Sequence, residues 1–202
     1  MIKTIIFDFG DVFINLDKTA TADAFSKLKT SSSQAFITQI NELYETGMIT
    51  TEEFFTHYST IYPELTSFLI KDAWNAILLD FPTHRLNFLQ QLAISKQYKL
   101  ILLSNTNELH IDWIKKNISH YQAFKSCFDQ FYLSHEINLR KPTADIFNFV
   151  LSKNQILPDE TIFIDDTKEH INTAASLGIH TWNIDPKKED ITTLFATKSD
   201  LF

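Results

Sequence analysis

Acidic side chains follow two apolar runs of the sequence, at the places where buried strands would end. Asp8 stands in "IIFDFGDVF" (5–13), and Asp165 and Asp166 end the run "TIFIDD" (161–166). An acid at a strand end can cap a turn, and one acid of an adjacent pair can cap the next helix. Adjacent carboxylates repel each other, however, unless a cation lies between them. Because Mg²⁺ prefers carboxylates, backbone carbonyls and water as ligands, the three acids predict a magnesium site.

A serine and a lysine occur at comparable positions. Ser104 and Asn105 end the apolar run "YKLILLSN" (98–105), and Lys141 precedes a proline just before a predicted helix. Alone, such residues are typical of a turn and of an exposed surface. Beside a metal and a carboxylate cluster, the lysine would neutralise a phosphate and keep a carboxylate ionised, and the serine would donate a hydrogen bond to a phosphoryl oxygen. The combination favours chemistry on a phosphate group.

Short apolar runs predict the strands that position these residues. The runs are rich in Ile, Leu, Phe and Val without clear alternation, as in strands that are buried on both faces. The predicted strands span residues 3–9, 98–105, 128–134, 160–166 and 179–184. Helical patterns at 83–96, 143–154 and 167–178 separate the later strands. Strands that alternate with helices predict an α/β fold with a Rossmann-like parallel sheet, in which ligands bind at the carboxyl ends of the strands.

The interval between the first two strands is too long for a single crossover helix. Helical patterns fill most of residues 16–80, and Thr50 with Glu53 predicts a capping box at the start of one of these helices. We therefore predict an all-helical cap domain at 16–80, inserted into a core domain that is formed by 1–15 and 81–202.

Composition and charge exclude several classes of function. The chain has 202 residues and a net charge of −7, with a pI near 5.4, which disfavours broad electrostatic binding to nucleic acid or to an anionic membrane. No run approaches the ~18 apolar residues of a membrane span, and the N-terminal residues predict a strand rather than a signal peptide. The single cysteine, Cys127, permits no internal disulfide, so we expect a cytoplasmic protein, either a monomer or a homodimer. With three glycines, the sequence contains neither the GxGxxG nor the GxxxxGK[ST] phosphate-binding motif.

Taken in chain order, the motifs resemble those of the haloacid dehalogenase-like (HAD) superfamily of hydrolases. The four motifs of that superfamily resemble "IIFDFGDVF", "ILLSNTN", "RKPTADIF" and "IFIDDT". The helical insert after the first motif is similar to the α-helical cap of the subfamily that includes small-molecule phosphatases and dehalogenases. "LYETGMITTEEFF", "AWNAILL" and "SNTNELH" resemble more closely a bacterial group that includes phosphatases acting on glucose 1-phosphate. The resemblance covers essentially the whole chain and implies a HAD-like core with an inserted cap.

The resemblance implies a Mg²⁺-dependent phosphatase of a small phosphorylated metabolite. Asp8 would be the nucleophile and would form an aspartyl-phosphate that water then hydrolyses. Ser104 would bind the transferring phosphoryl group, with Asn105 beside it. Lys141 would hold both Asp8 and the phosphate by its charge.

The implied metal ligands are the Asp8 carboxylate, the Gly10 backbone carbonyl and Asp166, with Asp165 binding directly or through water. Gly10 departs from many relatives, which carry at this place an acid that protonates the leaving oxygen and contributes ~10² to 10⁴ in rate. Asp11 lies one residue further, where an extended backbone would point its side chain to the other face, so we expect Asp11 to serve a turn. The glycine predicts a preference for leaving groups that depart with little protonation, as in an anomeric sugar phosphate or an acyl phosphate.

Substrate choice is expected to reside in the cap, which would close over the site and exclude water. The candidate lining residues are Glu45, Gly47, Trp74 and Asn75. Trp74 is at least as well suited to packing between cap and core. His170, where relatives often have Asn, is either a residue of a helix surface or a contact to the substrate or to a site residue. His110 is either a contact at a helix start or a residue of the site rim.

Two other functions are compatible with the same residues. A haloacid dehalogenase would use Asp8 on a carbon–halogen bond without metal, and the pair Asp165–Asp166 argues against it. A non-catalytic binding or regulatory protein could retain the fold, and Gly10 is the feature that favours it. Loss of Mg²⁺-dependent activity on Asp8→Asn separates the enzyme from the binding protein, and halide release without metal identifies the dehalogenase.

Overall fold

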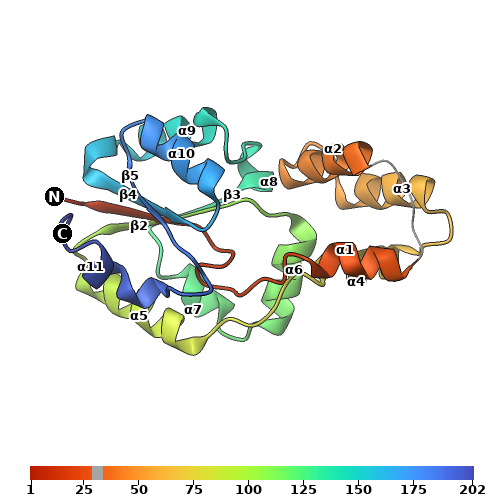
Figure 1. Cartoon of the computed structure of the whole chain (residues 1–202), viewed down its shortest axis with the longest axis horizontal. Coiled ribbons are helices and arrows are strands. Elements are labelled where there is room, and N and C mark those ends of the chain that lie inside the picture. The colour runs from red at the N-terminus through yellow and green to blue at the C-terminus, as the bar shows by residue number, and fades with distance from the viewer. Residues whose placement is uncertain (29–33) are drawn as a thin grey trace.

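A parallel sheet forms the centre of the protein. The computed structural model describes residues 1–28 and 34–202, so residues 29–33 of the predicted cap lie outside the described part. Within it, five strands pair in the order β3-β2-β1-β4-β5, all parallel (Figure 1). The strands are β1 (Thr4–Phe7), β2 (Lys99–Ser104), β3 (Gln130–Leu133), β4 (Thr161–Asp165) and β5 (His180–Asn183). Each lies inside one of the five predicted runs, so the predicted sheet is confirmed.

Helices cover both faces of this sheet, which is why its strands lack polar alternation. Along β1, Ile5 and Phe7 pack into one apolar cluster and Ile6 packs into the other. Helices α9 and α10 cover the face of Ile6, and α5, α6, α7 and α11 cover the opposite face. The helices of the core are α5 (Thr83–Ser95), α6 (Glu108–Asn117), α7 (Tyr121–Lys125), α8 (Ser134–Ile137), α9 (Ala144–Asn154), α10 (Lys168–Ser176) and α11 (Leu194–Thr197). The short 3₁₀ helices are η1 (Pro158–Glu160) and η2 (Ile191–Thr193).

Four helices between β1 and α5 form a separate group beyond the carboxyl ends of the strands (Figure 1). They are α1 (Ala20–Lys27), α2 (Gln34–Glu45), α3 (Thr51–Ile61) and α4 (Ser67–Asn75). Their aromatic and aliphatic side chains make an apolar cluster separate from the two that flank the sheet; it includes Tyr44, Phe54 and Tyr58 and is joined by Leu109 of the core helix α6. The predicted capping box of Thr50 and Glu53 is confirmed at the start of α3. The helical cap therefore has its own core, while the boundaries at residues 16 and 80 stay a prediction.

The two connections between core and cap run side by side. Leu16 and Leu78 form an antiparallel bridge. The Asn15 amide donates to the Asp80 carbonyl at 2.9 Å, and the Asp17 amide donates to the Ile77 carbonyl at 2.9 Å. The backbone groups of the two connections thus satisfy each other's hydrogen bonds. The chain therefore leaves the core and returns to it at adjacent positions.

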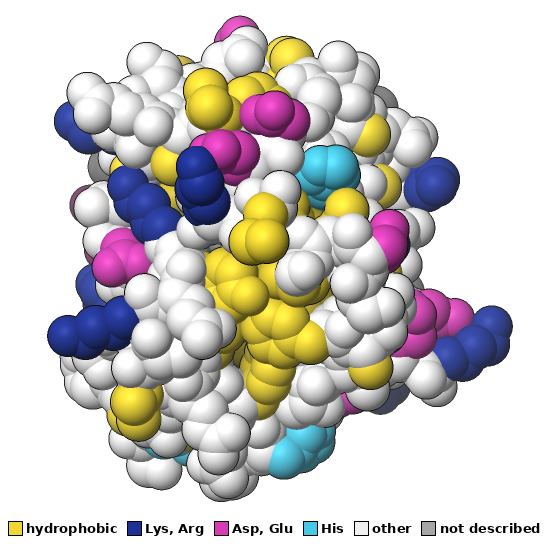
Figure 2. Space-filling view, turned by 90° about the vertical axis from the view of Figure 1, so that its left-hand side faces the viewer, with side chains coloured by type: hydrophobic (Ala, Val, Ile, Leu, Met, Phe, Trp, Pro, Cys, Tyr) yellow, Lys and Arg dark blue, Asp and Glu magenta, His cyan; other side chains and the backbone are white. Residues whose placement is uncertain are grey.

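The side of the molecule opposite the cap carries both chain ends, and hydrophobic side chains gather near the centre of this face (Figure 2). At this end, Tyr98, Phe195 and Phe202 pack their rings together, with centroid distances of 4.6 to 5.8 Å. Among the described residues, no helix has the length and apolar character needed to cross a membrane.

Candidate active site

The carboxyl ends of two neighbouring strands, β1 and β4, bring the predicted acids together. Asp8 directly follows β1, Asp165 is the last residue of β4, and Asp166 comes next. Each of the three offers a carboxylate oxygen within 4.8 Å of the others. Such a set of oxygen donors fits a hard cation such as Mg²⁺, and the carbonyl of Gly10 lies two residues from Asp8.

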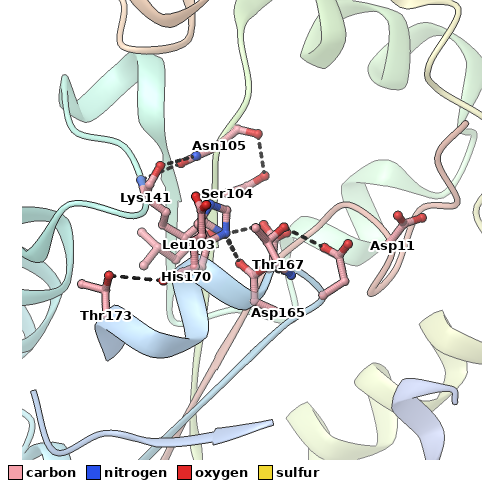
Figure 3. Close-up of polar contacts among 12 residues, drawn as sticks. Asp11, Leu103, Ser104, Asn105, Lys141, Asp165, Thr167, His170 and Thr173 are labelled. Atoms are coloured by element: carbon pink, nitrogen blue, oxygen red, sulfur yellow. Dashed lines mark hydrogen bonds and ion pairs between the residues drawn. The ribbon is translucent and has the colours of Figure 1, made fainter. Parts of the chain in front are cut away.

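Lys141 is the charge that lies among these acids. Its side chain is fully buried, and its ammonium contacts Asp8 Oδ1 at 2.8 Å, Asp165 Oδ2 at 2.7 Å and the Leu103 carbonyl at 2.8 Å (Figure 3). Burial works to lower the pKa of Lys141, but Asp165 and Asp8 outweigh it and hold the pKa above its ordinary value. A buried ammonium with three acceptors is well satisfied.

The two bridged carboxylates have different proton affinities. Burial raises the pKa of Asp8 to about 6, which Lys141 opposes and Asp165 reinforces. Burial also disfavours the ionised form of Asp165, but Lys141 and His170 outweigh it and lower the pKa of Asp165 to about 2. Asp8 and Asp165 share one lysine. Asp165 therefore stays ionised, and Asp8 is the more basic of the two carboxylates.

Asp165 already uses both of its oxygens within the protein. Oδ2 accepts from Lys141 and from the ring of His170, at 2.9 Å, and Oδ1 accepts from the Thr167 amide at 2.7 Å. These bonds suit a residue that orients Lys141 and the turn before α10. Direct or water-mediated metal binding by Asp165 stays a prediction. Two roles were predicted for His170, a residue of a helix surface or a contact to the substrate or to a site residue. The structure shows a contact to the site residue Asp165.

Ser104 and Asn105 lie beside Lys141, at the end of β2. The Asn105 amide makes two bonds to the backbone of Lys141, donating to its carbonyl at 2.8 Å and accepting from its N–H at 2.9 Å. Both polar groups of this side chain thus hold the loop that carries Lys141. Ser104 is 3% exposed, and among the described residues its hydroxyl makes one long contact of 3.5 Å, to the Asn105 carbonyl. Its hydrogen-bonding capacity is thus largely unused, and its contact with a phosphoryl oxygen stays a prediction.

Asp11 serves a turn, as predicted, but the extended backbone on which that prediction rested was wrong, because residues 11–13 form a turn. Its φ is 55°, in the left-handed region, and its Oδ1 accepts from the Leu16 amide at 3.0 Å. In Figure 3 it lies apart from Lys141 and Asp165. Gly10 precedes it where a Cβ would stand 2.7 Å from Leu16 Cδ1. The chain therefore has no acid side chain at position 10 and uses the one at position 11 to fix the backbone.

One residue of this region gave no sequence signal. The ammonium of Lys18 forms ion pairs with Asp166 Oδ2 and, at 3.2 Å, with Asp11 Oδ2. The sequence separates Lys18 from Asp166 by 148 residues. No spacing pattern links two residues so far apart, so sequence reasoning missed this lysine.

The predicted cap residues lie at two contacts between cap and core. Trp74 donates from Nε1 to Asn107 Oδ1 at 3.2 Å and stacks on His110, whose Nε2 contacts the Trp74 carbonyl at 3.2 Å. This is the packing role that was open for Trp74, and it places His110 at the joint between α4 and α6. Asn75 is buried, and its Oδ1 has no hydrogen-bond partner among residues 1–28 and 34–202.

The second contact joins the end of α2 to α8. Glu45 accepts from Arg140 at 2.9 Å, and its backbone carbonyl accepts from the Ser134 hydroxyl at 2.6 Å. Gly47 has a φ of +66°, and a Cβ there would stand 2.2 Å from the His135 carbonyl. Only glycine fits so close an approach in this conformation. Glu45 and Gly47 thus lie between cap and core, and their contact with a substrate stays a prediction.

Comparison with known proteins identifies the class to which this fold and site belong. Residues 5–184 match the family model of the haloacid dehalogenase-like hydrolases. The chain is 30% identical over 190 residues to the D-ribitol-5-phosphate phosphatase of Bacteroides thetaiotaomicron. The alignment covers 90% of this chain and 91% of that protein. The chain belongs to the haloacid dehalogenase-like hydrolase family.

Solved structures of similar proteins agree with this assignment. A HAD family enzyme of Bacteroides thetaiotaomicron, solved as a magnesium complex, aligns with a TM-score of 0.86 at 35% identity, covering 96% of this chain and 98% of that chain. A HAD-like hydrolase of Porphyromonas gingivalis aligns with a TM-score of 0.83 at 29% identity, covering 98% of each chain. The predicted family, the α/β fold with its helical cap and the hydrolytic class of enzyme are confirmed.

Proposed function

We propose that the protein is a Mg²⁺-dependent phosphatase of a small phosphorylated metabolite, working through an aspartyl-phosphate on Asp8. The observation that carries the proposal is the buried Lys141, which contacts both Asp8 and Asp165 in a cluster of three acids that Asp166 completes. A carboxylate with a pKa of about 6 is ionised at neutral pH and more nucleophilic than an ordinary one. The wild-type HAD family enzyme of Bacteroides thetaiotaomicron was solved with magnesium and inorganic phosphate, with a TM-score of 0.84 to this chain, which supports the choice of cofactor and chemistry.

In the proposed reaction, an oxygen of Asp8 attacks the phosphorus while the bond from phosphorus to the leaving oxygen breaks. Water then attacks the phosphorus of the aspartyl-phosphate, which releases phosphate and restores the carboxylate. Lys141 orients Asp8 and offers positive charge to the phosphoryl oxygens, and Ser104 donates its hydroxyl to one of them. Mg²⁺, held by Asp8, the Gly10 carbonyl and Asp166, would supply the charge that lets one anion approach another.

We further propose a sugar phosphate or polyol phosphate as the substrate class. A D-ribitol-5-phosphate phosphatase is among the relatives, and the sequence motifs resemble those of glucose 1-phosphate phosphatases. These substrates differ in the leaving group, because ribitol 5-phosphate releases a primary alcohol and glucose 1-phosphate releases an anomeric hydroxyl. Gly10 offers no acid, and Asp11 is bound to Leu16 and Lys18. On these grounds the anomeric phosphate is the substrate that needs the least help from the enzyme.

The test measures phosphate release from glucose 1-phosphate, ribitol 5-phosphate, glucose 6-phosphate and acetyl phosphate, with Mg²⁺ and with EDTA. Asp8→Asn removes the nucleophile, and the exposed Asp112→Asn on α6 is the matched control. We expect metal-dependent release that Asp8→Asn abolishes and Asp112→Asn retains. Equal rates across leaving groups of very different pKa would contradict the proposed effect of Gly10. Halide release from haloacids in EDTA would establish a dehalogenase, and no turnover of either the phosphates or the haloacids would contradict the proposed phosphatase and favour the non-catalytic alternative.

A further inference from the structure

Lys18 lies where the chain passes from the core to the cap. It follows Asp17, whose amide is bonded to the Ile77 carbonyl in the returning connection, and it precedes α1. The backbone before it is thus bonded to the returning connection, and the backbone after it continues into the first helix of the cap. A contact made by Lys18 with the core therefore acts on the segment that carries the cap.

The partners of Lys18 are two nearly buried carboxylates of the core. Its ammonium contacts Asp166 Oδ2, and Asp11 Oδ2 lies 3.2 Å away. The Asp166 side chain is 8% exposed, whereas that of Lys18 is 55% exposed. Asp166 belongs to the acidic cluster and is one of the ligands proposed for Mg²⁺. One face of this carboxylate is thus occupied by a cation of the protein itself.

We propose that Lys18 weakens Mg²⁺ binding at Asp166, so that metal binding and the contact of the cap connection with the core oppose each other. Two cations that share one carboxylate repel each other, and each reduces the gain of the other from the shared anion. Coupling of this kind is reciprocal, so the metal weakens the hold of Lys18 as much as Lys18 weakens that of the metal. This inference rests on the metal site of the proposed function.

A cleft beside Asp166 gives Lys18 room to move away when the metal binds. It has a volume of about 660 Å³ and opens to solvent, and Asp166, Lys18 and Lys187 are among the residues that line it. Lys187 provides a matched comparison, because it is a second lysine of the same cleft and, among the described ion pairs, none joins its ammonium to an acid. Removing it changes the net charge of the cleft equally and leaves the contact with Asp166 intact.

The experiment titrates the full-length protein with Mg²⁺ alone by calorimetry, at constant ionic strength and without substrate. We compare the wild type with Lys18→Met, Lys18→Arg and Lys187→Met. Lys18→Met is expected to bind Mg²⁺ about two- to fivefold more tightly, the scale of a half-exposed ion pair. Lys18→Arg keeps the positive charge and should bind as the wild type does, and Lys187→Met should change the affinity much less. Lys18 is half-exposed, so circular dichroism is expected to show that all four proteins are folded.

Hydrogen exchange gives an independent measurement on the wild type. Mg²⁺ is expected to increase exchange at the amides of residues 15–19, because it loosens the contact of Lys18 with Asp166. Equal Mg²⁺ affinities of wild type and Lys18→Met, or weaker binding by Lys18→Met, would overturn the inference and leave the metal site standing. Failure of the wild type to bind Mg²⁺ would overturn the metal site and this inference together.

Discussion

At the scale of single residues, the geometry of the candidate site depends on Lys141. The resemblance of the motifs implied that this lysine holds Asp8, and the ends of the apolar runs predicted that Asp8 and Asp165 lie close together, but the contact of Lys141 with Asp165 was not predicted. Nor did the sequence predict that Asn105 holds the backbone of Lys141, or that Lys18 binds Asp166. These contacts depend on how side chains from segments far apart in the sequence are oriented toward each other. Composition and periodicity do not predict such orientations.

Replacing Lys141 with methionine tests its role as the shared cation. The change leaves the carboxylates of Asp8 and Asp165 close together and buried without a counterion, which is expected to cost about 3–5 kcal/mol of unfolding free energy at pH 7. Urea denaturation measures this loss, and phosphate release should vanish with it. Lys71→Met, on the exposed face of α4, is the control. A stability unchanged from the wild type would show that the three groups do not depend on one another.

At the scale of elements, the joint between α4 and α6 unites the cap with the core. His110 lies under Trp74 and binds Asn107, and burial lowers its pKa to about 4, which the contact with the Trp74 carbonyl opposes. The imidazole is therefore neutral in the folded protein at pH 7. The sequence did not decide between the two roles considered for His110 or between the two considered for Trp74. A residue near a helix start can be recognised from the sequence, but the residues that pack against it cannot.

The joint at His110 predicts a dependence of stability on pH. Between pH 6.5 and about 4 the unfolded chain binds a proton at His110 that the folded chain does not, so stability falls as the pH is lowered through this range. The difference corresponds to up to about 3 kcal/mol. His110→Gln is expected to flatten this part of the profile of unfolding free energy against pH, relative to wild type and to His57→Gln on α3. Parallel profiles of wild type and His110→Gln would show that the histidine takes up its proton without loss of the fold.

At the scale of the whole molecule, the sheet and its order along the chain were predictable because each strand is a short run of buried apolar residues. Some long-range hydrogen bonds between side chains and distant segments were not predictable from the sequence. The buried guanidinium of Arg85 in α5 binds the Phe13 carbonyl at 3.3 Å, Asn15 Oδ1 at 2.9 Å and Asp190 Oδ2 at 2.9 Å. It thereby joins the segment after β1, the first helix after the cap and the C-terminal region.

The tie through Asp190 is tested by Asp190→Asn. Burial opposes ionisation, but bonds from His84, Thr192 and Arg85 hold the pKa of Asp190 well below its usual range. Its stabilising effect is therefore present above the pKa of an unfolded aspartate, about 3.9, and is lost as the pH falls further. We expect Asp190→Asn to lose about 1–3 kcal/mol at pH 7 in urea denaturation, and the gap to wild type to shrink below pH 4. A gap that stays constant at low pH would contradict an ionic contribution of Asp190.

The antiparallel pairing of Leu16 with Leu78 has a consequence for descent. The chain leaves the core for the cap and re-enters the core at residues that lie next to each other. The strand order of the sheet therefore does not depend on what lies between those residues. A gene could therefore exchange the coding segment between these two codons, or lengthen and shorten it, while the five strands and the acids at their ends stay in register. The part that would select the substrate and the part that would perform the chemistry are thus free to change at different rates.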